Sequence, residues 1–370
     1  MTTLRRRAGC VSRRFRMARV IANAMRSRHH PILAQVVPMR RCNLSCSYCN
    51  EFDKTSEPVA VDRMLARIDR LADLGTSLLD LSGGEPLLHP DLDLIINRVR
   101  QRGMMAGLLT NGYLLSPERI RRLNRAGLDR LQISIDNVLP DDVSVKSLKV
   151  LDRKLEMLAA HAYFDVNINT VVGNGIGQPG DALVIAKRAR ELGFGTSVGV
   201  IHDRSGQIVP LDPDRQRVHT SIAGLTRGFY SHGHDHLFQR NLIAGRSNAW
   251  QCRAGARYLY ICEDGLVHWC SQQRGTPGIP LDRYARADLD REYRSVKSCA
   301  PHCTVSCVHR VSLLDEIRET PLETLTRMGA GGPEGGRPPA SVNLLTWLFV
   351  TSRHHQTFRR LASRAFRLAR

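Results

Sequence analysis

The residues of this 370-residue chain with the clearest chemical signature are Cys42, Cys46 and Cys49, at Cys-x3-Cys-x2-Cys spacing. A cubane iron–sulfur cluster is usually held by four cysteine thiolates. A run that supplies three leaves one iron open to bind and reduce a small molecule, which indicates chemistry rather than electron transfer alone. The alternatives are a zinc site without its fourth ligand and three unconnected thiols, although zinc motifs more often pair one Cys-x2-Cys with another.

The neighbouring sequence predicts where these cysteines lie. Residues 32–38 are mostly apolar and fit a short buried strand, so the cysteines begin the loop at its C-terminal end, where barrel-like α/β folds place active sites. The next expected strand, residues 77–81, leads into Ser82-Gly83-Gly84-Glu85-Pro86. Two glycines let the backbone approach a ligand closely, and the Glu85 carboxylate can accept hydrogen bonds from an ammonium group.

Together these two runs resemble the radical S-adenosylmethionine (radical SAM) superfamily, over roughly residues 31–205. In that family an aromatic residue precedes the third cysteine, as Tyr48 does here. The resemblance implies that the cysteines hold a 4Fe-4S cluster, that SAM chelates its open iron, and that the run from Gly83 to Pro86 receives the SAM amino group. It also implies that polar residues at the ends of the fourth and fifth strands hold the SAM carboxylate and ribose; the candidates are Ser134, Asp136 and Asn169. For each candidate, a role in satisfying nearby backbone groups stays open.

The pattern between the motifs predicts the fold class, α/β. Apolar strand candidates alternate with amphipathic helical stretches at residues 61–74, 92–102, 117–126, 147–160 and 181–192, which is typical of βα units with a parallel sheet. A sixth strand is expected at residues 196–201. Six such units make the partial (β/α)6 barrel that the resemblance implies, open on one side and able to admit a large substrate.

A second group of cysteines follows the barrel: Cys252, Cys262, Cys270, Cys299, Cys303 and Cys307. An Asp264-Gly265 turn between two strand-like runs predicts a β-hairpin that brings distant cysteines together. The spacing of Cys252, Gly265 and Cys270 resembles the opening half of the SPASM or twitch modules of many radical SAM enzymes, which bind auxiliary 4Fe-4S clusters. Six thiols cannot fully ligate two cubanes, so one auxiliary cluster is expected, held by Cys252, Cys270 and two of Cys299, Cys303 and Cys307. A four-cysteine zinc site is the alternative, and Cys262 also fits a small core residue.

Composition limits the remaining functions. Seventeen of the nineteen net positive charges lie in residues 1–50 and 341–370, so the central part is nearly neutral, which argues against nucleic-acid binding. The sequence contains no run of about 18 apolar residues, so it predicts no membrane-spanning helix. Residues 342–370 fit a basic amphipathic helix that lies on an anionic membrane surface or docks on its own barrel. Oxygen-sensitive clusters indicate a cytoplasmic protein, peripheral at the membrane if the tail binds lipid.

These observations divide the chain into a basic N-terminal extension (1–30), the barrel (31–215), a connecting segment (216–250), the auxiliary cluster domain (251–312), a linker (313–341) and the basic tail (342–370). The resemblance implies an oxidoreductase-type enzyme that cleaves SAM reductively and abstracts hydrogen from a small-molecule, lipid or peptide substrate. An auxiliary cluster would assist oxidation or bond formation, and a flavodoxin or ferredoxin would supply electrons. The alternatives are a peptide-modifying maturase and a non-enzymatic iron–sulfur or zinc protein.

Overall fold

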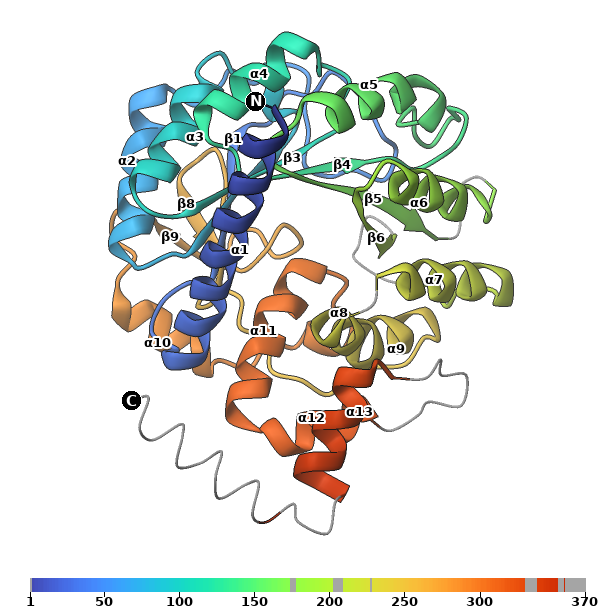
Figure 1. Ribbon diagram of the computed structural model, residues 1–370. Coiled ribbons are helices and arrows are strands. Elements are labelled where there is room, and N and C mark those ends of the chain that lie inside the picture. The colour runs from blue at the N-terminus through green and yellow to red at the C-terminus, as the bar shows by residue number, and fades with distance from the viewer. Residues whose placement is uncertain are drawn as a thin grey trace.

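The computed structural model describes residues 2–173, 178–201, 209–226, 228–329, 338–351 and 356, and it contains the predicted half-open barrel (Figure 1). Six parallel strands form it: β1 (Leu33–Met39), β2 (Leu78–Gly83), β3 (Met105–Thr110), β4 (Arg130–Ser134), β5 (Asp165–Val172) and β6 (Gly195–Val200). Five helices connect them: α2 (Val61–Asp73), α3 (Leu92–Gln101), α4 (Pro117–Ala126), α5 (Leu148–His161) and α6 (Asp181–Glu191). A single 3-10 turn, η1 (Pro86–Leu88), follows β2. The α/β fold and the six expected strands are confirmed.

Local sequence signals explain why the βα units begin and end where they do. In α4, the Ser116 side chain accepts a hydrogen bond from the Arg119 N–H, and Gly127 ends the helix with a left-handed φ of 86°. Ile120 and Leu123 lie one turn apart on the buried face of this helix and pack into the core between helices and sheet. Such signals are local, which is why the predicted helix boundaries agree with the structure to within one or two residues.

The hairpin of the second cysteine group continues the barrel sheet instead of forming a separate one. It consists of β7 (Tyr258–Ile261) and β8 (Leu266–His268), followed by β9 (Pro277–Pro280). Strand β7 pairs in parallel with β1, so one sheet runs in the order β6-β5-β4-β3-β2-β1-β7-β8-β9. The Tyr258 hydroxyl also donates a 2.7 Å hydrogen bond to Gln35 Oε1 inside the sheet. The barrel and the auxiliary region therefore share one hydrogen-bonded framework.

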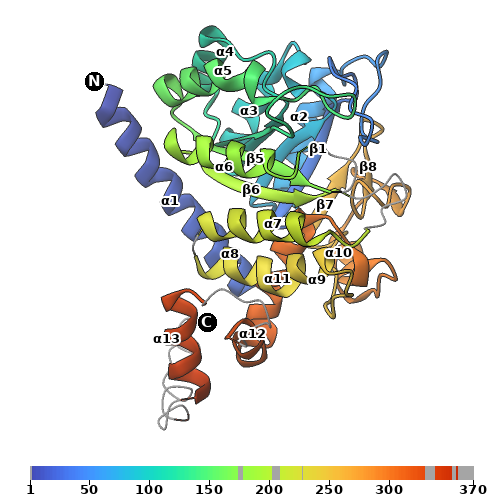
Figure 2. The same ribbon diagram turned by 90° about the vertical axis from the view of Figure 1, so that its right-hand side faces the viewer.

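The N-terminal extension forms a long helix, α1 (Thr2–Arg26), that lies along the open side of the barrel (Figures 1 and 2). Val20 and Ala24 are buried in the core. Arg13 pairs with Asp165 at 2.8 Å, and Arg16 pairs with the buried Asp129. Residues 9–26 are thus part of the barrel wall.

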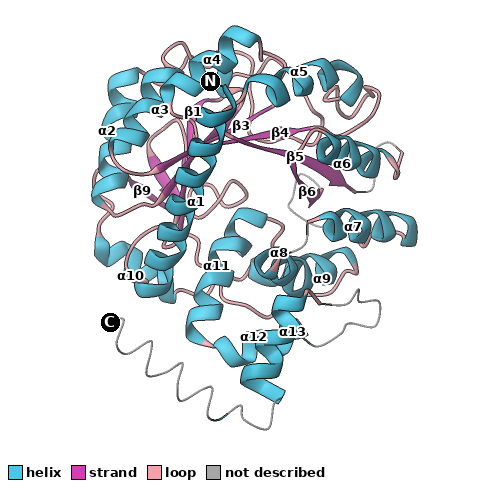
Figure 3. Cartoon of the chain, in the orientation of Figure 1, coloured by secondary structure: helices cyan, strands magenta, loops and turns pink. Residues whose placement is uncertain are grey.

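The C-terminal part is mostly helical (Figure 3). Its elements are α7 (Pro213–Leu225), α8 (Phe229–His234), the π-helical turn η2 (Asp235–Gln239), α9 (Arg240–Ile243), α10 (Arg286–Arg294), the 3-10 turn η3 (Ala300–His302), α11 (Ser306–Glu319), α12 (Pro321–Gly329), α13 (Ala340–Thr346) and the π-helical turn η4 (Trp347–Thr351). Residues 313–329, expected in a linker, form the second half of α11 and all of α12, because Leu313 and Met328 pack in one buried cluster. Most of the predicted basic tail lies outside the described residues. Within the described residues, no helix combines the length and the hydropathy of a transmembrane span.

A fully buried guanidinium ties these parts together. The Arg257 side chain donates to Asp315 Oδ2 on α11 at 3.0 Å, to the Ala24 carbonyl on α1 at 3.0 Å and to the His30 carbonyl at 2.5 Å. Burial lowers the pKa of Arg257, and the facing Asp315 carboxylate opposes that shift. Three segments that are distant in sequence therefore meet at one cation.

We expect the Arg257→Met substitution to lower the free energy of unfolding by about 3 kcal/mol, because it leaves two backbone carbonyls and part of a buried carboxylate unpaired. Arg318, which also pairs with Asp315, limits the loss. Urea denaturation followed by circular dichroism measures the change. Arg121→Met, at an exposed pair with Glu118, is the matched control and should change stability by less than about 1 kcal/mol. Equal effects of the two substitutions would contradict the assigned role of Arg257.

Candidate active site

The loop that follows β1 carries the first three cysteines. Its two ends are joined, because the Cys42 N–H donates to the Asp53 carbonyl and the Asp53 N–H donates to the Arg40 carbonyl, both at 3.0 Å. Cys46 is buried, whereas Cys42 and Cys49 are partly buried, and none of the three is in a disulfide. Burial raises the pKa of the Cys42 and Cys49 thiols, and the thiol of Cys46 contributes to both shifts. The three thiols thus belong to one electrostatic group.

The two glycines of the Gly-Gly-Glu-Pro run let the β2 loop lie directly against this cysteine loop. A Cβ on Gly83 would lie 2.5 Å from Val37 Cγ1, and a Cβ on Gly84 would overlap the carbonyl oxygens of Arg40 and Arg41. The Gly84 N–H donates to Met39 O at 3.1 Å. The backbones of the two predicted motifs are therefore in contact at the C-terminal ends of β1 and β2.

The Glu85 carboxylate points into the protein rather than toward a ligand. It is fully buried and accepts hydrogen bonds from Leu87 N–H (2.9 Å), the Thr110 hydroxyl (2.7 Å) and Asn111 N–H (2.8 Å). Burial raises its pKa, and these three donors oppose the rise. Glu85 thus joins the ends of β2 and β3, while Pro86 begins η1. We infer that the backbone of this run, rather than the Glu85 carboxylate, would face an ammonium group.

Tyr48 and Asp136, predicted from different motifs, lie together in a buried network. The Tyr48 hydroxyl donates to Asp136 Oδ2 at 2.6 Å, and the Ser144 hydroxyl donates to the same oxygen at 2.6 Å. Ser144 Oγ also lies 3.6 Å from Cys46 Sγ. Lys146 completes the network, with its ammonium 3.1 Å from Asp136 Oδ2 and in hydrogen-bond contact with Tyr48. The other Asp136 oxygen, Oδ1, is buried and has no partner among the described residues, so it is free to accept a bond from a ligand.

Sequence reasoning missed Lys146 and Ser144. Burial would lower the pKa of Lys146, but the carboxylate of Asp136 and the hydroxyl of Tyr48 hold it well above its ordinary value. Burial and then the Asp136 carboxylate raise the pKa of Tyr48. The network therefore places an ammonium close to the cysteine loop. The signal that was available is that the chain has only six lysines, and Lys146 is the first of the three that lie between the fourth and fifth strands.

Ser134 and Asn169 are neighbours across the sheet, at the C-terminal end of β4 and in β5. The Asn169 carbonyl accepts a 2.9 Å hydrogen bond from Ile135 N–H, and its side-chain oxygen accepts one of 2.9 Å from Ser197. Asn169 also lines a large cavity inside the barrel, which Ser134 does not line. The assignment of both residues to SAM remains a prediction.

Four cysteines of the second group are brought together by the hairpin and by the segment before α11. The thiols of Cys252, Cys270 and Cys299 all contribute, after burial, to a pKa of Cys303 well above the ordinary value. Burial raises the pKa of Cys252 to about 11 and that of Cys270 to about 12. A buried lysine, Lys297, lies beside the cluster, and its pKa is lowered by burial and raised by Cys252. This arrangement offers four thiol donors from distant parts of the sequence.

Cys307 and Cys262 lie elsewhere. Cys307 lines the barrel cavity, where after burial the carboxylate of Asp80 raises the pKa of its thiol. Cys262 lies with Asp264 and His268 in a group whose ligand atoms are within 4.8 Å of one another. His268 Nδ1 accepts a hydrogen bond from Gly275 N–H at 2.8 Å, so in the neutral ring Nε2 carries the proton and offers no lone pair to a metal. This group is therefore a poor metal site.

The spacing of the thiols tests which metal group they fit. Thiolates around one tetrahedral zinc ion lie about 3.8 Å apart, given Zn–S bonds of about 2.3 Å. Among the described residues, only the group at Cys262 has three ligand atoms within 4.8 Å of one another, so neither other cysteine group is as compact as a single-ion site. Thiolates that ligate different corners of a cubane are farther apart. Both groups consist of cysteine thiols, and cysteine thiolates are the usual ligands of a 4Fe-4S cluster.

Comparison with known proteins agrees with this geometry. Residues 36–202 match the family model described as the radical SAM superfamily. Residues 36–202, the barrel, belong to the radical SAM superfamily. The matched residues begin in β1 and end just after β6, so they cover both motifs of the site and the barrel strands except the first three residues of β1.

Among curated radical SAM relatives, the chain is 41% identical over 98 residues to an AdoMet-dependent heme synthase of Methanosarcina barkeri, covering 26% of this chain and 28% of that protein. It is 35% identical over 101 residues to a PqqA peptide cyclase of Gluconobacter oxydans, again covering 26% and 28%. The chain thus matches little more than a quarter of the length of these relatives.

Two solved structures share the fold. One is SuiB of Streptococcus suis bound to S-adenosylmethionine, with a TM-score of 0.52, 15% identity and coverage of 79% of this chain and 75% of that one. The other is anSMEcpe with bound AdoMet and a peptide, with a TM-score of 0.52, 14% identity and coverage of 90% and 100%. The likeness includes regions beyond the barrel, so the C-terminal half also follows an architecture found in solved proteins.

Proposed function

We propose that this radical SAM protein cleaves S-adenosylmethionine reductively and directs the resulting radical at a substrate inside its barrel. The observation that carries the proposal is the backbone contact between the cysteine loop and the Gly83-Gly84 run, at the end of a barrel that encloses a cavity of about 1200 Å³. Cys42, Cys46 and Cys49 would hold the cluster. When bound there, a 4Fe-4S cluster supplies the electron that splits SAM into methionine and a 5′-deoxyadenosyl radical, which abstracts hydrogen from the substrate.

The surrounding residues position the cofactor in this proposal. The Gly83–Pro86 backbone would receive the SAM amino group, since the Glu85 carboxylate is already bonded within the protein. Asp136 Oδ1, buried and without a partner in the described part of the chain, would accept a hydrogen bond from SAM. Lys146 and Tyr48 hold the other Asp136 oxygen, and therefore fix the direction in which Oδ1 points. Ser134 and Asn169 would contact SAM from the ends of β4 and β5.

We further propose that Cys252, Cys270, Cys299 and Cys303 hold one auxiliary 4Fe-4S cluster in a SPASM- or twitch-like module. Their mutual proximity supports this ligand set and leaves out Cys307. The cluster would assist oxidation or bond formation on the substrate radical. A peptide-modifying reaction is the second candidate, favoured by the identity to PqqA peptide cyclase, which covers 26% of the chain.

The ligand set leads to a prediction about iron content. Cys303→Ser should lower the iron content of the reconstituted protein from about eight to about four per chain, because the auxiliary cubane is expected to be lost when one of its four proposed thiolate ligands is removed. Cys307→Ser, four residues after the last cysteine of the proposed set, should keep about eight. Iron is measured colorimetrically together with the visible absorption of the clusters. Retention of eight irons in Cys303→Ser and loss in Cys307→Ser would reverse the assignment.

The proposed activity is tested under anaerobic conditions with the full-length chain. The protein is reconstituted with iron and sulfide, reduced with dithionite and given SAM, and 5′-deoxyadenosine is measured by chromatography. Many radical enzymes need substrate for turnover, so binding of SAM is measured in parallel by equilibrium dialysis. Formation of 5′-deoxyadenosine supports the proposal, whereas neither binding nor cleavage of SAM by a protein with about eight irons would overturn it.

A further inference from the structure

The cavity inside the barrel is walled by parts that the sequence assigned to different domains. Its volume is about 1200 Å³, which exceeds the roughly 300–1000 Å³ of common small-molecule sites. The barrel strands form one wall, α1 forms a second and α11 a third. Most of the lining side chains are apolar, among them Met17 and Ile21 of α1, Leu131 of β4 and Val311 of α11. The space therefore suits the apolar body of a large ligand.

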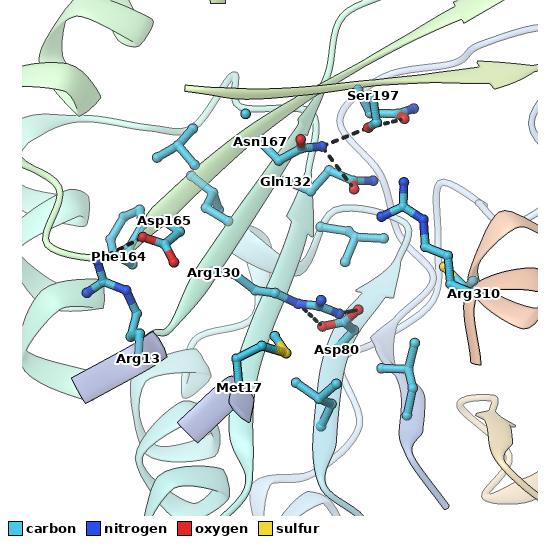
Figure 4. Close-up of a pocket in the computed structure, with 18 of the residues that line it drawn as sticks. Arg13, Met17, Asp80, Arg130, Gln132, Phe164, Asp165, Asn167, Ser197 and Arg310 are labelled. Carbon is cyan, nitrogen blue, oxygen red and sulfur yellow. Dashed lines mark hydrogen bonds and ion pairs between the residues drawn. The ribbon is translucent and has the colours of Figure 1, made fainter. Parts of the chain in front are cut away.

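The charges of the cavity do not balance. Its lining includes three arginines and two aspartates. Arg13 pairs with Asp165 at 2.8 Å, and Arg130 Nε donates to Asp80 Oδ1 at 3.1 Å. The remaining cation is Arg310, which has no ion pair with any described residue and extends from α11 toward the cavity in Figure 4. Arg310 is exposed, so its guanidinium is accessible to an anionic ligand.

The opposite wall adds hydrogen-bond donors. Asn167 Nδ2 donates to Ser197 Oγ at 2.8 Å and to Gln132 Oε1 at 3.5 Å (Figure 4). Ser197 Oγ in turn donates to Asn169 Oδ1 at 2.9 Å. This ladder uses the amide oxygens of Gln132 and Asn169. Their NH2 groups have no acceptor among the described residues. Like Arg310, they can only donate, so the polar part of the cavity is complementary to a group that accepts hydrogen bonds.

We propose that the barrel cavity binds an amphiphilic organic anion: an apolar body packed between α1 and the strands, with a carboxylate or phosphate group held by Arg310. If the proposed function is correct, this anion is the substrate of the reaction. Binding of the anion itself does not depend on the proposed function. An anionic group is chosen because a guanidinium binds carboxylate or phosphate with two parallel charge-assisted hydrogen bonds. The ladder donors would orient the acceptor atoms that Arg310 does not reach.

Two probes with the same aromatic skeleton separate the contributions of charge and volume. Anilinonaphthalene sulfonate is the amphiphilic anion, and N-phenylnaphthylamine is its neutral counterpart without the sulfonate. Binding of each probe to the anaerobically reconstituted full-length protein is measured by equilibrium dialysis, which cluster absorbance does not disturb. The variants are Arg310→Gln, Arg310→Lys, Met17→Trp and the control Arg14→Gln, at an exposed arginine outside the cavity lining.

The expected pattern distinguishes the cavity from general binding to a basic protein. Arg310→Gln should weaken the anionic probe about tenfold or more, the effect of one charge-assisted hydrogen bond, and change the neutral probe by less than about twofold. Arg310→Lys should restore part of the loss. Met17→Trp, which fills the cavity, should weaken both probes. The proposal is overturned if Arg14→Gln and Arg310→Gln weaken the anion equally, or if Met17→Trp changes neither probe.

This result is independent of the proposed reaction, because dialysis needs neither dithionite nor SAM. If probe binding depends on Arg310 but the chain neither binds nor cleaves SAM, the result would contradict the proposed reaction and support the proposed ligand class. If the chain cleaves SAM but binding of the anionic probe does not depend on Arg310, the result would support the proposed reaction and contradict the proposed ligand class.

Discussion

Replacing Cys42, Cys46 and Cys49 together with alanine is expected to reduce 5′-deoxyadenosine formation to the background level and to remove about four of about eight irons. The three thiols form one electrostatic group in the loop after β1, and iron coordination by this group is what the proposed reaction requires. The auxiliary thiols lie in the segments around the β7–β8 hairpin and beside η3, away from the loop after β1, so their cluster should remain. Iron content, visible absorption and 5′-deoxyadenosine are measured on the same anaerobic samples.

The control for this variant is Cys10→Ala, which removes a thiol of α1 that belongs to neither cysteine group. It should retain the iron content and the activity of the wild type. Unchanged 5′-deoxyadenosine in the triple variant would refute the assignment of the cluster to this loop. Loss of all iron together with loss of helical circular dichroism would mean that the loop is required for folding, and the single Cys46→Ser variant would then replace the triple variant.

The second large effect on activity is expected when one methyl group is added at Gly84. Gly84→Ala should lower 5′-deoxyadenosine formation about a hundredfold, because its Cβ would overlap the carbonyl oxygens of Arg40 and Arg41 and push the cysteine loop away from the run that we propose to bind SAM. Such overpacking should also cost about 1–3 kcal/mol of stability. SAM affinity by equilibrium dialysis and the urea midpoint measure the two effects.

Gly180→Ala is the matched control, because a Cβ at Gly180 would meet nothing within 4 Å and its φ is −71°. It should leave SAM affinity and activity unchanged. Normal SAM affinity in Gly84→Ala would show that the contact between the two loops is not needed for cofactor binding, and the proposed site would have to be revised.

The sequence contained enough local information to predict the barrel. Caps such as Ser116 and Gly127, and apolar residues one turn apart, determine the helices without reference to the rest of the fold. The position of the hairpin in the sheet could not be predicted from the sequence, because a strand such as β7 has no local property that selects β1 as its partner. The role of α1 could have been inferred in part, since Met17, Val20, Ile21 and Ala24 recur at helical spacing among the arginines.

In the candidate site, too, local sequence motifs could be predicted, whereas contacts between residues distant in sequence could not. The cysteines, the glycines and Tyr48 were predicted from motifs whose members are close in sequence. Lys146 and Ser144 reach Asp136 because the loop after β4 folds back over the cysteine loop, as the hydrogen bond from Ser47 N–H to the Val143 carbonyl shows. Arg310 lies 180 residues after Arg130, and only the docking of α11 against the barrel brings both to one cavity. Charge balance in that cavity could not be judged from composition.

The pairing of β7 with β1 makes the barrel and the auxiliary region inseparable. A fragment that ended before residue 251 would leave β1, the strand that leads into the cysteine loop, as an open sheet edge with unpaired backbone groups. It would also lose Arg257, which fixes α1 and α11 to the sheet. A displacement of β7 would therefore be transmitted through backbone hydrogen bonds to β1, the strand that leads into the cysteine loop.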